Sequence, residues 1–215
     1  MEERAKRLEG SPIPIVIFFI SNRYFCLAER QNAQYGKPKV GGPFELVDSE
    51  TGKTVTDADF QGKFMILYFG FTHCPDVCPD ELEKMASAIQ KVDAISGVGS
   101  MVTPVFITVD PQRDTAEAVK TYIKEFHPRF VGLTGSQEQV DRVAKAYRVY
   151  VSKGDMGVNG SEDDYLVDHS IFFFFMDPEG TFHDFFGRNS TADDIADKIV
   201  KAVREWKKDR ESGRL

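Results

Sequence analysis

Two cysteines separated by three residues stand in the segment best suited to chemistry. Cys74 and Cys78 lie in GFTHCPDVCPD, residues 70–80, directly after an apolar run of strand length. If a helix begins near Cys74, residues four apart share one face and their Cβ atoms lie about 5–6 Å apart. Such a pair can close a disulfide after modest relaxation, or hold one metal ion as two thiolates.

The residues around the pair bear on its reactivity. A helix N-terminus favours the thiolate form of a cysteine. Asp76, Asp80 and Glu81 oppose that effect, so only a moderate lowering of the thiol pKa is expected.

The cap of this helix has two candidates. Pro75 suits the first helical position if Cys74 is the cap, and Pro79 suits it if Cys78 is the cap.

Two Cys-Pro steps in a strand-to-helix turn argue against cysteines that only fill core space. Redox pairs more often have two intervening residues, so the wider spacing favours metal binding or a specialised redox role.

The elements that must position these cysteines alternate between strands and helices. Residues 44–55 predict a hairpin with its turn at 49–52, and the apolar runs 63–71 and 102–110 predict strands buried on both faces. A stripe at helical spacing runs from Leu82 to Val92. Further helices are predicted over 114–126, 136–148 with Ser136 as N-cap, and 191–208. The remaining predicted strands are 131–135, 148–153, 166–177 and 181–187, with a polar loop at 154–164 and a turn at 177–180.

This order is a βαβ alternation that ends in ββα, which is typical of a thioredoxin-like fold. The chain is therefore predicted to be α/β, with a central mixed sheet of four or five strands flanked by helices and an N-terminal β-hairpin. The four consecutive phenylalanines at 172–175 are expected in the core, with alternate rings on opposite faces of the sheet.

A histidine precedes that aromatic strand. In a thioredoxin-like sheet the segment VDHS, residues 167–170, would lie beside the helix start that carries the cysteines, so His169 is a candidate third ligand. Two thiolates and an imidazole suit Cu(I), and also Cu(II) in a tetragonal site completed by water or a carboxylate. Structural zinc would need a fourth protein ligand, for which His73 could be proposed.

Five segments closely resemble the Sco family (synthesis of cytochrome c oxidase), and its mitochondrial branch in particular. The resemblance covers about residues 38–208. The segments are YFGFTHCPDVCPDEL (68–82), PVFITVDPQRDT (104–115), EFHPRFVGLTGS (125–136), YRVYVS (147–152) and DYLVDHS (164–170).

The resemblance implies a copper chaperone with a thioredoxin-like domain on one N-terminal membrane anchor. Cys74, Cys78 and His169 would bind one copper ion, and Asp110 matches an acidic residue near the site. The implied location is the mitochondrial inner membrane, facing the intermembrane space. The implied partners are cytochrome c oxidase subunit two, whose binuclear copper site the family helps to build, and an upstream copper donor.

Other functions use the same cysteines without the histidine. The chain could act as a thiol–disulfide oxidoreductase on that subunit, with Cys74 attacking and Cys78 resolving. The shared fold also permits a thiol peroxidase or a redox sensor. Enzymatic activity is otherwise not expected.

Composition excludes several classes of protein. With 27 Lys and Arg against 34 Asp and Glu, the formal net charge is −7, which argues against nucleic acid as the main partner. Three cysteines are too few for a fold stapled by disulfides. Hydrophobic residues at 41% and charged residues at 28% are typical of a globular domain.

Residues 1–37 are expected to be an N-terminal segment and linker, either disordered or a truncated anchor, before a Sco domain at 38–211. The apolar run 12–20 contains two prolines and is about half the 18–20 residues that a membrane span needs. The anchor that the family implies is therefore not visible in this segment, and Cys26 within it receives no role.

The remaining candidates receive minor roles. His73 flanks the cysteine pair and could tune it. His127 is predicted to end a helix, and His183 to be structural within a hairpin. Met156 is expected in a solvated loop rather than as a transient copper ligand.

Overall fold

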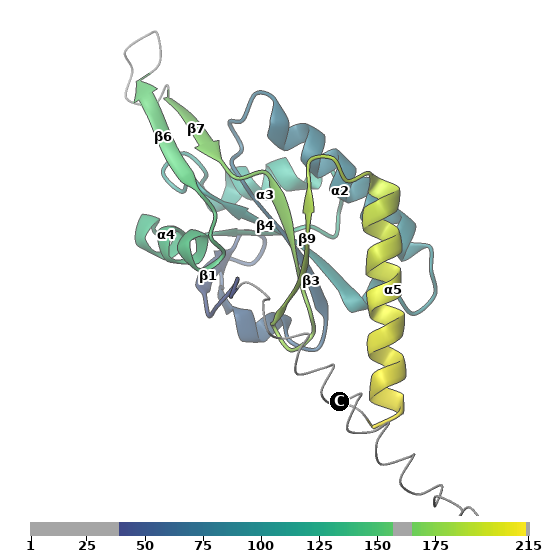
Figure 1. Ribbon diagram of the computed structural model, residues 1–215. Helices are drawn as coiled ribbons and strands as arrows, with labels where there is room; N and C mark the ends of the chain where they lie inside the picture. The colour runs from purple at the N-terminus through teal and green to yellow at the C-terminus, as the bar shows by residue number, and fades with distance from the viewer. Residues whose placement is uncertain (1–38, 157–164, 214–215) are drawn as a thin grey trace, which may run out of the picture. The chain divides into compact units, whose positions relative to one another are not determined.

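The computed structural model describes residues 39–156 and 165–213 (Figure 1). A compact unit begins at Val40. The strands are β1 Glu45–Asp48, β2 Thr54–Thr56, β3 Phe64–Gly70, β4 Val102–Thr108, β5 Val131–Thr134, β6 Val151–Met156, β7 Tyr165–His169, β8 Phe172–Met176 and β9 Phe182–Gly187. The helices are α2 Val77–Asp93, α3 Ala116–Lys124, α4 Gln137–Ala146 and α5 Ala192–Glu211, with 3-10 turns η1 Asp57–Phe60 and η2 Gly99–Met101.

The described strands form two sheets. The larger has seven strands in the order β2-β1-β5-β4-β3-β8-β9, and the smaller pairs β6 with β7. β3 runs parallel to β4 and antiparallel to β8, so Tyr68 lies between Phe106 and Phe173. Every residue of β3 is buried, as expected for a strand covered on both faces. This is the mixed sheet flanked by helices that the sequence predicted.

Aromatic rings mark the two faces of the large sheet. Tyr68 packs against Phe106 and Phe173 on the face covered by α2, whereas Phe69 packs on the other face against Tyr147, at the end of α4. Figure 1 shows α4 and α5 on opposite sides of the sheet, with α5 alongside α2. The predicted helical stripe from Leu82 to Val92 is the buried face of α2.

The prediction of four or five strands was wrong. The hairpin of β1 and β2 forms as predicted, but β1 also pairs antiparallel with β5 and so extends the central sheet. β9 adds the opposite edge by pairing with β8.

The single strand predicted over 166–177 was also wrong. The chain leaves one sheet and enters the other at Ser170 and Ile171, because β7 pairs with β6 while β8 pairs with β3. The main-chain N–H of Ser170 donates to the carbonyl of Tyr150, 3.1 Å away, and this bond fixes the end of the two-stranded sheet of β6 and β7. Phe172 is 41% exposed and not in the core, unlike the three phenylalanines that follow it.

No helix within residues 39–156 and 165–213 combines the length and apolar character needed to cross a bilayer. The segment predicted over 1–37 lies outside the described residues, as does most of the polar loop predicted at 154–164.

Candidate functional site

The two cysteines lie on either side of a helix start. Helix α2 begins at Val77 with Asp76 as its N-cap, so Cys74 precedes the helix and Cys78 lies in its first turn. Neither cysteine is the cap, which corrects both sequence alternatives. The main-chain N–H of Cys78 donates to Cys74 Sγ at 3.4 Å, so the free backbone donors of the helix start face the outer sulfur.

Cys78 is the buried member of the pair. Its Sγ atom lies 3.3 Å from Nε2 of His169 and 3.5 Å from the Tyr68 hydroxyl, and its side chain is fully buried. The hydrogen bond to Cys74 and the loss of solvent both raise the pKa of the Cys78 thiol. The proton of the pair therefore stays on Cys78.

Cys74 is the reactive member. The pKa of Cys74 is lowered to about 5, chiefly by the hydrogen bond from the Cys78 thiol; the main-chain N–H groups of Asp76, Cys78 and Val77 contribute to this lowering, and partial burial opposes it. The expectation of only a moderate lowering was wrong, because it did not include a hydrogen-bond donor from the second cysteine. At neutral pH this site holds one thiolate beside one thiol.

His169 ends strand β7 and reaches the inner cysteine. Its ring is buried and contacts Tyr68 and Phe71 edge to face, with ring centroids 6.0 and 5.8 Å away. Nδ1 lies 3.0 Å from the carbonyl oxygen of Ser170, which can only accept a hydrogen bond. The ring proton therefore belongs on Nδ1, and Nε2 points its lone pair at Cys78. Burial lowers the pKa of His169, which keeps the ring neutral near pH 7.

The structure thus places Cys78 in contact with both Cys74 and His169, residues from two distant parts of the chain. Among residues 39–156 and 165–213, no group of three His, Cys, Asp or Glu side chains is arranged closely enough to hold a metal ion as it stands. The two contacts share Cys78 as their common member.

The chain matches the SCO1/SenC family model over residues 32–204. The chain belongs to the SCO1/SenC family. Among curated relatives, it is 50% identical to the mitochondrial SCO1 homolog 1 of Arabidopsis thaliana and 47% identical to the mitochondrial SCO1 homolog of Homo sapiens. Both alignments cover 85% of this chain, but only 52% and 59% of the respective relatives, so the chain spans little more than half their length.

Solved structures of SCO1/SenC proteins share the fold. The crystal structure of Arabidopsis thaliana ScoI with copper bound has a TM-score of 0.70 and 52% identity, over 77% of this chain and 99% of that one. The crystal structure of yeast Sco1 with copper bound has the same TM-score and 46% identity, over 78% of this chain and 90% of that one. These similarities support the predicted thioredoxin-like fold and the mitochondrial branch of the family.

The carboxylate that the family resemblance placed near the cysteine pair is linked to His169 through two intervening side chains. Asp110 is fully buried and accepts a hydrogen bond from Nε of Arg113 at 2.5 Å. The guanidinium carbon of Arg113 lies 5.8 Å from the ring centroid of Phe71, which in turn contacts His169. The contacts from Asp110 therefore reach the histidine through Arg113 and Phe71.

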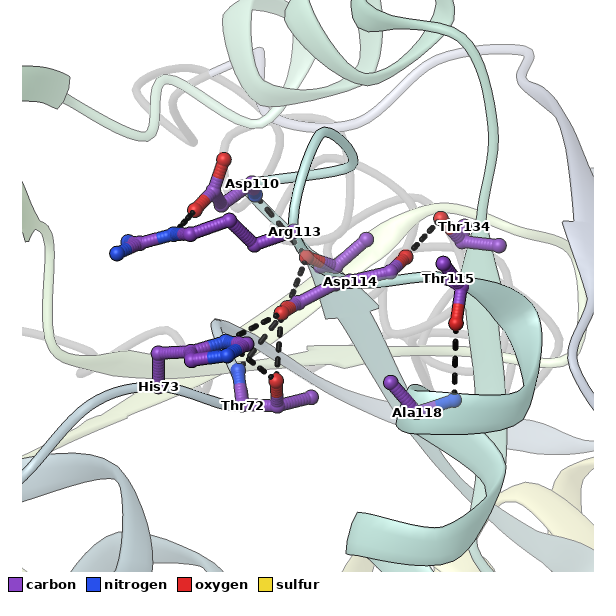
Figure 2. Close-up of polar contacts among 9 residues, drawn as sticks. Thr72, His73, Asp110, Arg113, Asp114, Thr115, Ala118 and Thr134 are labelled. Carbon is purple, nitrogen blue, oxygen red and sulfur yellow. Dashed lines mark hydrogen bonds and ion pairs between the residues drawn. The ribbon is translucent and has the colours of Figure 1, made fainter. Parts of the chain in front are cut away.

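Sequence reasoning missed a second carboxylate, Asp114, which organises the loop before Cys74 (Figure 2). Asp114 is fully buried; its Oδ2 accepts from the Thr72 main-chain N–H at 2.9 Å and from the Thr108 hydroxyl at 2.6 Å. Its Oδ1 accepts from the Thr72 hydroxyl at 2.6 Å and lies 3.4 Å from Nδ1 of His73. The available signal in the sequence was its position in the loop that follows the carboxyl end of β4, because ligand sites lie at that end of parallel strands.

His127 and His183 have their described contacts away from the cysteine pair. His127 follows α3 and accepts from the main-chain N–H of Arg129, as predicted for a helix-end residue. His183 packs edge-on against Phe64 and Phe175 within the hairpin of β8 and β9. Met156 ends strand β6 and so is not in a loop, and Cys26 lies outside the described residues.

Proposed function

We propose that the chain binds one copper ion, Cu(I) or Cu(II), through Cys74, Cys78 and His169, and acts as a copper chaperone. The observation that carries the proposal is the 3.3 Å contact between Cys78 Sγ and His169 Nε2, beside the Cys74 thiolate. Copper is the cargo, and the two SCO1/SenC relatives crystallised with copper bound support this choice of metal.

The chemistry of the three side chains fits copper. Two sulfur ligands and an imidazole are soft enough for Cu(I). His169 offers Nε2 while its Nδ1–H is held by the Ser170 carbonyl, which is how ligating histidines are usually oriented. Cys78 keeps its thiol proton in the metal-free arrangement, so binding as a second thiolate releases that proton.

The target we propose is the binuclear copper site of cytochrome c oxidase subunit two, with copper arriving from an upstream donor protein. We place the activity in mitochondria, at the inner membrane facing the intermembrane space, as the named mitochondrial relatives and the family resemblance suggest. Asp110 is proposed to act at a distance from the metal, by holding Arg113 against Phe71.

The test is an anaerobic titration of the fully reduced chain with Cu(I) against the chelator bicinchoninate. We expect one tightly held copper per chain. His169→Ala should weaken the affinity for Cu(I) more than about 100-fold. Loss of a residue that only hydrogen-bonds to a metal ligand already costs 10–100-fold in metal affinity, and loss of the ligand itself should cost more. His183→Ala removes an imidazole away from the site and should change nothing. Unchanged affinity in His169→Ala would remove that residue from the ligand set.

A second function is favoured by the division of roles between the two cysteines. Cys74 is a thiolate that is only partly buried, and Cys78 is a buried thiol, as in a dithiol that reduces disulfides. Cys74 would attack a disulfide of the oxidase subunit, and Cys78 would displace the mixed disulfide. The products are a Cys74–Cys78 disulfide and a reduced partner. Cys78→Ser should then trap the mixed disulfide, and its absence would count against this role.

A further inference from the structure

His73 is the most exposed of the potential copper ligands at the cysteine pair. Its side chain is 52% exposed, whereas Cys78 is fully buried and His169 is 6% exposed. It immediately precedes Cys74, which is itself only partly buried. His73 and Cys74 are therefore the members of this set that solvent reaches, whereas Cys78 and His169 are enclosed.

The hydrogen bonds around His73 fix which ring nitrogen is available (Figure 2). The hydroxyl of Thr72 donates to Asp114 at 2.6 Å, so its oxygen can only accept from Nδ1 of His73, 3.0 Å away. Asp114, 3.4 Å from the same nitrogen, can likewise only accept. The proton of the neutral ring therefore belongs on Nδ1, and Nε2 carries a free lone pair.

A buried carboxylate behind a histidine is the usual support of a metal ligand. Ligating histidines donate their second ring N–H to a carboxylate, a carbonyl or water, which sets the ring orientation and raises ligand strength. Asp114 is in turn held by Thr72 and Thr108, so the support is rigid. His73 thus has the oriented imidazole of a ligand together with the exposure of a surface residue.

We infer that His73 is the entry ligand for copper, which binds Cu(I) first and passes it to Cys74. The inference rests on the proposed copper-binding function and adds a step to it. Cu(I) remains Cu(I) throughout, because one bond from the donor's ligand is exchanged for one bond to Nε2, and that bond is then exchanged for one to the Cys74 thiolate. No proton leaves His73. Asp114 is the positioning residue that holds the ring for this exchange.

The experiment measures the rate of uptake separately from the final affinity. Reduced full-length chain is mixed in a stopped-flow instrument with Cu(I) bicinchoninate, and the loss of chelator colour is followed without oxygen. His73→Gln should slow uptake about tenfold, equivalent to ~1.4 kcal/mol in the barrier. Its equilibrium affinity should stay within about threefold of the unmodified chain. The matched control, His183→Gln, should leave both quantities unchanged.

Asp114→Asn tests the positioning role. It should also slow uptake, because Asn is a weaker acceptor for the ring N–H. In the double variant with His73→Gln it should add no further slowing, since Asp114 then has no imidazole to orient. If Asp114→Asn does not fold, Thr72→Val removes the hydroxyl that also receives the ring N–H and takes its place.

The results of these experiments separate the entry role of His73 from a permanent or structural role. Unchanged uptake in His73→Gln would refute the entry role, and a loss of affinity equal to the loss of rate would make His73 a permanent ligand or a structural residue. Additive effects of the two substitutions would make Asp114 structural. If the unmodified chain takes up no copper at all, the proposed function fails first, and this inference fails with it.

Discussion

The pKa of Cys74 should depend on a single hydrogen-bond donor, the thiol of Cys78. That donor is the largest cause of the lowering to about 5, ahead of the main-chain N–H groups at the helix start. Cys78→Ala deletes it and leaves the backbone donors in place. Cys78→Ser keeps a donor at the same position and is the matched control.

The magnitude follows from the thiolate fraction. With a pKa of about 5, roughly 90% of Cys74 is ionised at pH 6. If Cys78→Ala raises the pKa by about 2 units, roughly 9% is ionised at that pH, a loss of about tenfold. Cys78→Ser should retain most of the thiolate.

The assay is the pH dependence of alkylation of Cys74 by iodoacetamide, read by mass spectrometry in a Cys26→Ser background. The midpoint of the profile reports the pKa, while the plateau also reflects intrinsic nucleophilicity. We expect a midpoint near pH 5 for the intact pair and for Cys78→Ser, and a clearly higher midpoint for Cys78→Ala. The same low midpoint in Cys78→Ala would refute the reasoning and assign the effect to the helix start.

Three further predictions concern stability and pH. Arg148 follows the C-cap Tyr147 of helix α4 with a φ of 56°, and the main-chain N–H groups of Arg148 and Val149 donate to the carbonyls of Lys145 and Ala144 in the last turn. Arg148→Gly should raise the free energy of unfolding in urea by about 1 kcal/mol, and a decrease would show that the arginine side chain contributes more than its backbone strain costs. Ile107 is fully buried in β4, and Ile107→Ala should lower the free energy of unfolding by about 3–4 kcal/mol in the same urea titration. A loss below about 1 kcal/mol would mean that neighbouring core side chains fill the space. Burial lowers the pKa of His169, so the native state binds its proton less readily than the unfolded chain; the metal-free protein should therefore lose stability as the pH falls through 6.5 toward the lowered value, and His169→Gln should flatten that part of the profile. An unchanged slope in His169→Gln would assign the acid sensitivity to other groups.

The sequence predicted the elements around the site better than the contacts within it. The apolar run at 63–71 and the cysteine spacing were sufficient to place a buried strand before a helix, and the VDHS segment was sufficient to bring His169 to it. The strand and the helix follow from local patterns, and the placement of His169 follows from the order of the strands in a thioredoxin-like sheet. The start of α2 could not be predicted, because each proline supported a different cap and the structure uses Asp76.

Two of the remaining errors, the broken strand and the overlooked carboxylate, come from contacts between residues distant in sequence. The strand at 166–177 is broken because β7 pairs with β6, and periodicity carries no information about that partner. Asp114 was overlooked because a carboxylate in a turn is most often a local cap, whereas this one accepts hydrogen bonds from Thr72 and Thr108. The pKa of Cys74 was misjudged because the donor is a side chain whose orientation only the folded structure defines.

The contact between Cys78 and His169 joins residues 91 positions apart in the chain. During synthesis from the N-terminus, both cysteines are made well before the histidine, and the strand that follows His169 must still pair with β3. Copper held by all three side chains would bind only the finished fold, and so would stabilise it by mass action over any partly folded form. Occupancy of the site would then report that folding is complete.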